Sequence, residues 1–106
     1  MLISEKYPET KKMNHNQKYD FLIDKIGFER IVPYLPVDEN KIIKAYKKDE
    51  SLNNIKLKLW DQRVPFIRNL AKNRLDIDTI SIAECVCIMK ACARQIAEKT
   101  KEQNYV

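Results

Sequence analysis

The sequence predicts a soluble, all-α protein: a small bundle of four to five helices with a long C-terminal helix. Apolar residues recur at spacings of three and four over most of the chain, which is the period of an amphipathic helix. Only one glycine, Gly27, is present among 106 residues, whereas β-sandwiches and barrels need many tight turns that usually require glycine. A hydrophobic fraction of 44% beside 33% charged residues indicates a globular chain with enough apolar carbon to offset chain entropy.

Residues 1–16 are polar and contain Pro8 and several charges, so they predict a flexible N-terminal arm. The remainder, 17–106, is predicted to be a single helical domain. Its first helix is expected over 17–26, with Asn16 as the N-cap, because four apolar residues share one helix face: Tyr19, Leu22, Ile23 and Ile26. Gly27 follows as the residue expected to take a left-handed conformation and end the helix.

Two prolines, Pro33 and Pro36, limit the apolar segment 28–36, so we expect one helical turn followed by an extended crossing. Its core residues are expected to be Phe28, Ile31, Val32 and Leu35, with Tyr34 facing the surface. The next helix is predicted over 38–48, where Asp38 supplies the N-cap. An Asn- and Asp-rich turn is predicted at 49–54.

A further helix is predicted over 55–72, since Trp60, Val64 and Ile67 keep the helical period. Pro65 lies inside it and is expected to kink or split it. The segment 73–80 is expected to be a loop or a short extended piece. We expect Trp60 to be a core residue, although a large amphipathic ring can also anchor an interface.

The last helix is predicted over 82–102 and opens with a capping box of Ser81 and Glu84. Its first half is apolar around much of its girth, which predicts either the central helix of the fold or one face of a homodimer. After Arg94 the helix becomes charged and is expected to project. The residues expected on the apolar stripe are Ile82, Cys85, Val86, Ile88, Met89, Cys92, Ala93 and Ile96.

Nothing in the sequence indicates catalysis, a cofactor or a metal site. Structural zinc needs four ligands, but Cys85 and Cys87 point to different sides of a helix and the only histidine, His15, is far along the chain. Packing is the preferred interpretation of the three cysteines, and Cys87 is the best candidate for a redox role. A single glycine cannot build a phosphate-binding loop. We therefore expect a non-enzymatic protein.

The cellular compartment is predicted to be the cytoplasm. No apolar run approaches the length of a membrane span, and lysines interrupt the N-terminal segment where a signal-peptide core would lie. Three cysteines clustered on one segment do not make a disulfide framework.

A basic segment is the most suggestive feature for function. The formal net charge is +5, but Lys, Ile and Asn are all frequent, as AT-rich genomes favour, so the charge is either functional or compositional. Two predicted helices joined by a short turn resemble a helix-turn-helix, whose base-reading residues would be Asn53, Asn54, Lys56 and Lys58. The candidate binding residues for a partner or nucleic acid are Lys41, Lys44, Lys47, Lys48, Lys56, Lys58, Arg63 and Arg68.

The sequences LNNI at 52–55, WD at 60–61 and AECVCIMK at 83–90 resemble small accessory proteins of phages and mobile elements of low-GC Gram-positive bacteria. The resemblance spans the C-terminal two thirds and carries no motif of known chemical role. It implies regulation of the element or blocking of a host protein such as a defence nuclease. Because this chain is basic, a blocker of its kind would bind an acidic protein surface or the guide-RNA backbone of a nucleoprotein. The alternative is a helix-turn-helix DNA-binding regulator.

Overall fold

The computed structural model describes residues 3–47, 57–77 and 80–103. The predicted all-α class is confirmed: these residues form seven α helices, two 3-10 helices and no strand. In chain order the elements are α1 (Ile3–Lys6), η1 (Pro8–Lys12), α2 (His15–Ile26), α3 (Phe28–Ile31), η2 (Val32–Tyr34), α4 (Glu39–Lys47), α5 (Leu57–Asp61), α6 (Val64–Leu75) and α7 (Ile82–Gln103).

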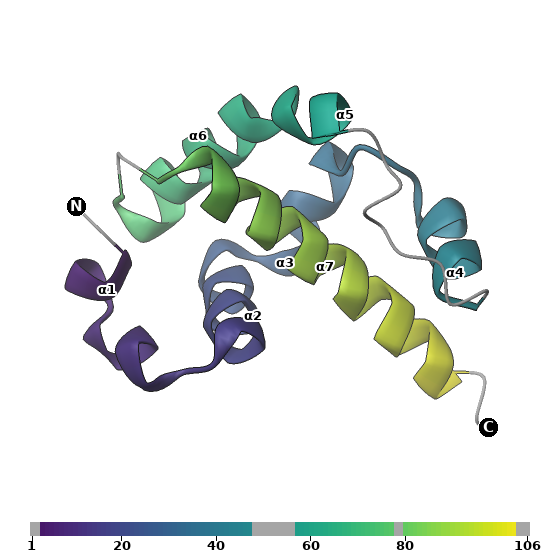
Figure 1. Ribbon diagram of the computed structural model, residues 1–106, viewed down its shortest axis with the longest axis horizontal. Coiled ribbons are helices and arrows are strands. Elements are labelled where there is room, and N and C mark those ends of the chain that lie inside the picture. Colours follow the sequence, from purple (N-terminus) through teal and green to yellow (C-terminus); the bar gives the residue numbers. More distant parts are fainter. Residues whose placement is uncertain (1–2, 48–56, 78–79, 104–106) are drawn as a thin grey trace.

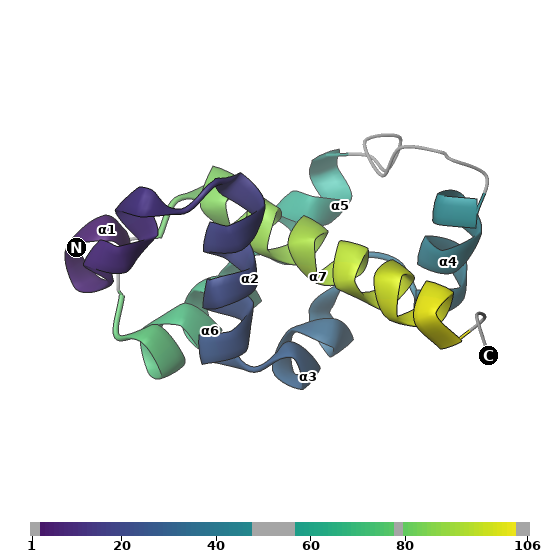
Figure 2. The same ribbon diagram turned by 90° about the horizontal axis from the view of Figure 1, so that it is seen from below.

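The long C-terminal helix is the centre of the fold. α7 contacts α2, α3, α4, α5 and α6, and Figures 1 and 2 show the shorter helices arranged around it, with α1 and α4 near opposite ends of the molecule. Cys85, Ile88, Met89 and Cys92 are fully buried within the single chain, so the prediction of a central helix is confirmed. One residue of the predicted stripe is misplaced: Ile82 is 52% exposed.

The predicted capping box at the start of α7 explains that difference. Ser81 Oγ accepts a hydrogen bond from the Glu84 backbone N–H at 3.1 Å, and Glu84 Oε1 accepts one from the Ser81 N–H at 3.2 Å. The first turn is therefore held by polar contacts, and the buried stripe begins one turn later, at Cys85.

The second half of α7 packs further than its charge predicts. Ile96 and Ala97 remain buried, so the expectation that α7 projects directly after Arg94 is wrong. The cause is a clamp to α2, in which Arg94 Nη2 lies 2.6 Å from Asp20 Oδ1 and Gln95 Nε2 donates to the same oxygen at 2.9 Å. These polar side chains therefore contact α2, whereas helical periodicity alone predicts that they face solvent.

The ends of α2 follow the sequence with one correction. The helix begins at His15, and its N-cap is Asn14 instead of the predicted Asn16. Asn14 Oδ1 accepts the Gln17 N–H at 2.8 Å, and Gln17 Oε1 accepts the Asn14 N–H at 3.1 Å, which completes a reciprocal capping box. At the other end Gly27 has a φ of +108° and donates its N–H to the Ile23 carbonyl at 2.8 Å. The predicted positive φ is confirmed, but ψ is +110°, so Gly27 does not take the left-handed helical conformation that was expected.

Residues 3–12, which the sequence assigns to a flexible arm, form α1 and η1 and lie against the domain. Ile3 is only 3% exposed. The Tyr7 hydroxyl donates to the Leu75 carbonyl at 3.3 Å, and its ring meets Phe21 edge-on at 5.7 Å. Most charged side chains of this segment are exposed, while Tyr7 contacts α2 and α6 and Ile3 is buried in the core cluster. The polar composition of the segment gave no sign of these contacts.

Both proline-containing segments are helical. The expected helical turn over 28–36 is present as α3 and is prolonged by η2, so the backbone becomes extended only at Leu35. Pro33 is tolerated in η2 because it lies in a first turn, where its missing N–H needs no partner. The helix predicted over 55–72 is split as expected: α5 ends at Asp61 and α6 begins at Val64, with Pro65 in its first turn. α6 continues to Leu75, and Asp76 at φ +57° ends it, so the loop begins later than predicted.

The remaining expectations concern α4 and the core. Asp38 Oδ1 accepts the Lys41 N–H at 2.8 Å, as predicted for the cap, whereas the predicted turn at 49–54 lies outside the described residues. Trp60 is 1% exposed, as expected of a core residue. Ile31 and Leu35 are buried, and Phe28 and Val32 pack partly buried against the core. Within the described residues, no helix combines the length and apolar character of a membrane span.

Candidate interaction surface

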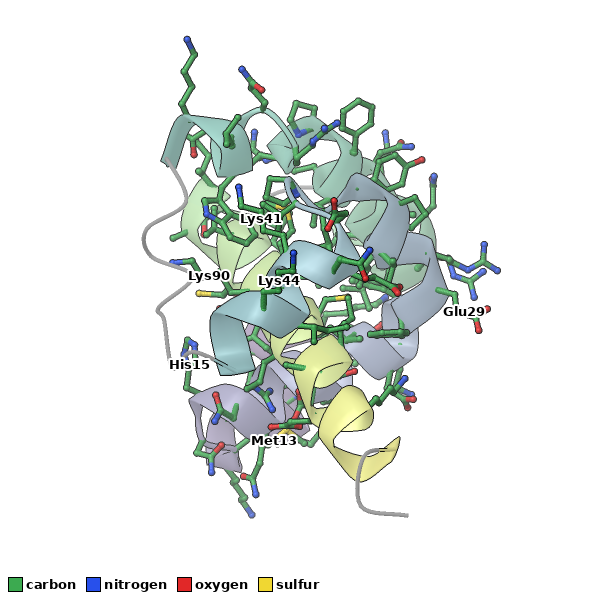
Figure 3. All side chains as sticks on the ribbon, turned by 90° about the vertical axis from the view of Figure 1, so that its right-hand side faces the viewer. Met13, His15, Glu29, Lys41, Lys44 and Lys90 are labelled. Carbon is green, nitrogen blue, oxygen red and sulfur yellow. The ribbon has the colours of Figure 1, made fainter. Side chains whose placement is uncertain are left out.

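Two basic residues of α4 have exposed side chains. Lys41 and Lys44 are both exposed, and their spacing of three residues places them on one face of the helix. Figure 3 shows both on the same side of the molecule as Lys90 of α7. The Lys90 ammonium lies 5.9 Å from the centre of the Trp60 ring, so its aliphatic stem passes close to the core. α4 packs against α7 through Ile42, which is fully buried.

The other predicted basic residues are divided among different environments. Lys58 on α5 is exposed, and Arg63, in the break before α6, is half-buried. Arg68 is exposed, but its Nε donates to the Ile80 carbonyl at 3.0 Å, which ties α6 to the start of α7. The side chain of Lys47 and the residues Lys48, Asn53, Asn54 and Lys56 lie outside what the structure describes.

The ion pairs of the described residues do not involve α4 or α5. In the described part of the chain the ion pairs join Lys6 to Asp76, Lys18 to Glu84, and Arg94 to Asp20 and Glu98. None of these involves Lys41, Lys44 or Lys58. Their ammonium groups therefore keep their charge available for a partner, whereas the paired cations join α1 to the end of α6 and α2 to α7.

The helix that would read DNA is interrupted, in keeping with the split predicted near Pro65. A recognition helix inserts a continuous helical segment into the major groove, but the described chain turns at residues 62–63, between α5 and α6. Trp60, the fourth of the five residues of α5, is buried in the core. Of the predicted base-reading residues, the structure describes Lys58 alone, and this side chain is exposed.

An aromatic pair that the sequence did not single out lies on the surface. The rings of Tyr34 in η2 and Phe66 in α6 are stacked, with centroids 5.0 Å apart and an interplanar angle of 10°. Phe66 remains 45% exposed. Helical spacing could have predicted that Phe66 is exposed, because it does not share the buried face of Val64, Ile67 and Ala71. Helical spacing cannot predict its stacking partner, which lies 32 positions away in the sequence.

The cysteines behave as packing residues. Burial raises the pKa of the Cys85 thiol to about 11 and that of Cys92 to about 12, so both are neutral at physiological pH. Cys87 is half-buried beside Tyr19. Burial is the main cause that raises the pKa of Tyr19, and the neighbouring Cys87 and Glu84 add to it. His15 packs on the Tyr19 ring at 4.9 Å, and among the described residues no three His, Cys, Asp or Glu side chains form a metal-binding group.

Comparison with known proteins yields no relative. No protein-family model matches the chain, and neither a curated protein nor a solved structure shows significant similarity to it.

Proposed function

We propose that this chain is a non-enzymatic binding protein of the cytoplasm, an accessory factor of a phage or mobile element that binds a host macromolecule. The observation that carries the proposal is the set of exposed lysines on α4 and α5: Lys41, Lys44 and Lys58. In the described chain none of them has a carboxylate partner.

Exposed ammonium groups on short helices suit attraction and orientation. Their field reaches about 8 Å at physiological ionic strength and raises the rate of encounter with an acidic surface. The buried Ile42 fixes α4 to α7, so Lys41 and Lys44 are presented from a packed scaffold. A suitable partner is an acidic protein surface or a nucleoprotein, as expected of an inhibitor of a defence nuclease.

The proposal is tested by affinity purification from a lysate of a low-GC Gram-positive bacterium, with the tagged chain as bait. The variant Lys41→Glu/Lys44→Glu should lose the captured host macromolecule. The matched control is Lys11→Glu/Lys12→Glu, which changes the net charge equally on exposed residues of η1, away from α4. Equal capture by both variants, or loss in both, would contradict a role for α4, and sedimentation analysis of the captured complex would reveal a homodimer.

The alternative is a helix-turn-helix regulator, favoured by the exposed Lys58 next to the buried anchor Trp60. It predicts duplex DNA binding that weakens steeply with salt and prefers one sequence. The variants Lys56→Ala and Lys58→Ala should each weaken such binding, whereas duplex affinity unchanged in both would count against the regulator.

A further inference from the structure

α6 differs from the other long helices in its charge. Its twelve residues include no aspartate or glutamate. Its core side is formed by Val64, Ile67, Ala71 and Leu75, while its exposed residues combine an aromatic ring, two side-chain amides and several cations: Pro65, Phe66, Arg68, Asn69, Lys72, Asn73 and Arg74.

Spacing places the most distinctive of these residues on one face. Phe66, Asn69 and Asn73 follow each other at intervals of three and four residues, so their side chains lie in a row along α6. Lys72 and Arg74 flank the far end of this row, and neither takes part in an ion pair with a described residue. The nearest acid in sequence, Asp76, is paired with Lys6 at 3.2 Å.

Phe66, the first residue of the row, has an exposed ring that contacts Tyr34 on one face. Tyr34 stacks against it nearly in parallel, yet 45% of Phe66 remains open to solvent. An aromatic ring held in this way offers a flat apolar surface in a fixed orientation, at little further entropic cost on binding.

We propose that the exposed face of α6 binds single-stranded nucleic acid. An unpaired base stacks on the open part of Phe66 and extends the Tyr34–Phe66 pair. Lys72 and Arg74 contact backbone phosphates, and the amides of Asn69 and Asn73 donate to and accept from base edges. Aromatic stacking combined with cations along a backbone path is the usual means of binding single strands.

Two features favour this partner over duplex DNA or a protein. In a duplex both faces of a base are covered by its neighbours, so an exposed ring has no base to stack on unless the helix is unstacked at a cost. A protein surface presents cations as well as anions, whereas α6 offers amides and cations without a carboxylate. That combination complements a chain of phosphates and unpaired bases.

The inference does not depend on the proposed function, because it uses a different helix. The variant Lys41→Glu/Lys44→Glu removes charge from α4 and leaves Phe66 and its row intact. If that variant loses a host partner but still binds single strands, the two surfaces are independent.

Fluorescence anisotropy with short labelled oligo(dT) and oligo(U) tests the proposal, and a duplex of mixed sequence is the comparison ligand. Phe66→Ala should weaken single-strand binding by about 5- to 150-fold, the range expected for one stacked base. Ile82→Ala is the matched control, since Ile82 is an apolar residue exposed to a similar extent, and it should bind as the unaltered chain does. Circular dichroism establishes that each variant is folded.

Further variants separate stacking from apolar contact and from charge. Phe66→Leu retains apolar area but has no aromatic face, so it should bind as weakly as Phe66→Ala. Phe66→Trp should retain affinity, and its exposed indole should lose fluorescence when a base stacks on it. Lys72→Ala should reduce the salt dependence of log K by about 0.7, the value for one phosphate contact on a single strand.

The proposal is overturned if the unaltered chain binds neither oligonucleotide or binds the duplex more tightly than both single strands. It is also overturned if Phe66→Leu binds single strands as tightly as the unaltered chain does. Tighter binding of both oligonucleotides than of the duplex, with loss in Phe66→Ala, supports the proposal, and the tighter of the two shows whether the site prefers the ribose and uracil or the deoxyribose and thymine.

Discussion

Gly27→Ala is expected to destabilise the fold by about 1–2 kcal/mol. The backbone at this position, with φ +108° and ψ +110°, is a region that L-residues occupy at a cost of about 1–3 kcal/mol. The loss of chain freedom in the unfolded state returns about 0.4–1 kcal/mol. In addition, the new Cβ would lie 3.1 Å from Arg30 Cδ and 3.3 Å from its Nε, a contact that an exposed and flexible arginine can relieve.

Urea unfolding followed by circular dichroism measures this change, and thermal unfolding should show a fall of about 4–15 °C in Tm. A double-mutant cycle with Arg30→Ala separates the two causes. If backbone strain dominates, Gly27→Ala costs the same with and without the arginine side chain. A variant as stable as the unaltered chain would refute the reasoning, and a cost that disappears with Arg30→Ala would assign it to the side-chain contact.

Three further changes test the capping, burial and titration of other residues. Ser81→Ala removes the hydroxyl that accepts the Glu84 N–H and should lower the free energy of unfolding by about 1 kcal/mol; no change in urea unfolding would contradict the cap. Ile3→Ala should cost about 2–4 kcal/mol because the side chain is 3% exposed, whereas a loosely docked segment would show almost no loss. Because folding raises the thiol pKa values of Cys85 and Cys92 from 9.0 to about 11 and about 12, the native state retains protons that the unfolded state releases, so stability should fall from about pH 9 to pH 12. Cys85→Ala/Cys92→Ala should flatten that fall, and identical pH profiles would contradict it.

Local signals in the sequence predicted much of the scaffold. The positive φ of Gly27, the cap formed by Ser81 and the split at Pro65 each depend on a few neighbouring residues, and each is present in the structure. An apolar girth too wide for a helix with only one covered side predicted that α7 is either the central helix or one face of a homodimer, and the structure places it at the centre of the chain's fold. Such features are encoded within about one turn of where they act, so composition and spacing suffice.

The differences arise where the determining contact is distant in the sequence. The predicted arm lies on the domain because Tyr7 meets Leu75 and Phe21 and Ile3 is buried in the core cluster, which no local pattern reveals. The charged residues that begin at Arg94 predicted a projecting helix end. Arg94 instead donates to Asp20 at 2.6 Å, although the two residues are 74 positions apart in the sequence. Polar composition predicted solvent exposure in both cases, and a tertiary partner reversed it.

Contacts between residues distant in the sequence also decide which candidate surface can supply binding energy. Charge was visible in the sequence and drew attention to 41–68, but exposed charges mainly set the rate and orientation of an encounter. The stacked pair of Tyr34 and Phe66 was not visible, because its rings are brought together from separate helices. Aromatic rings held in this way are the residues that most often dominate affinity. A substitution at Phe66 should therefore change the rate of dissociation from its ligand, whereas substitutions at Lys41 and Lys44 should change the rate of association with theirs.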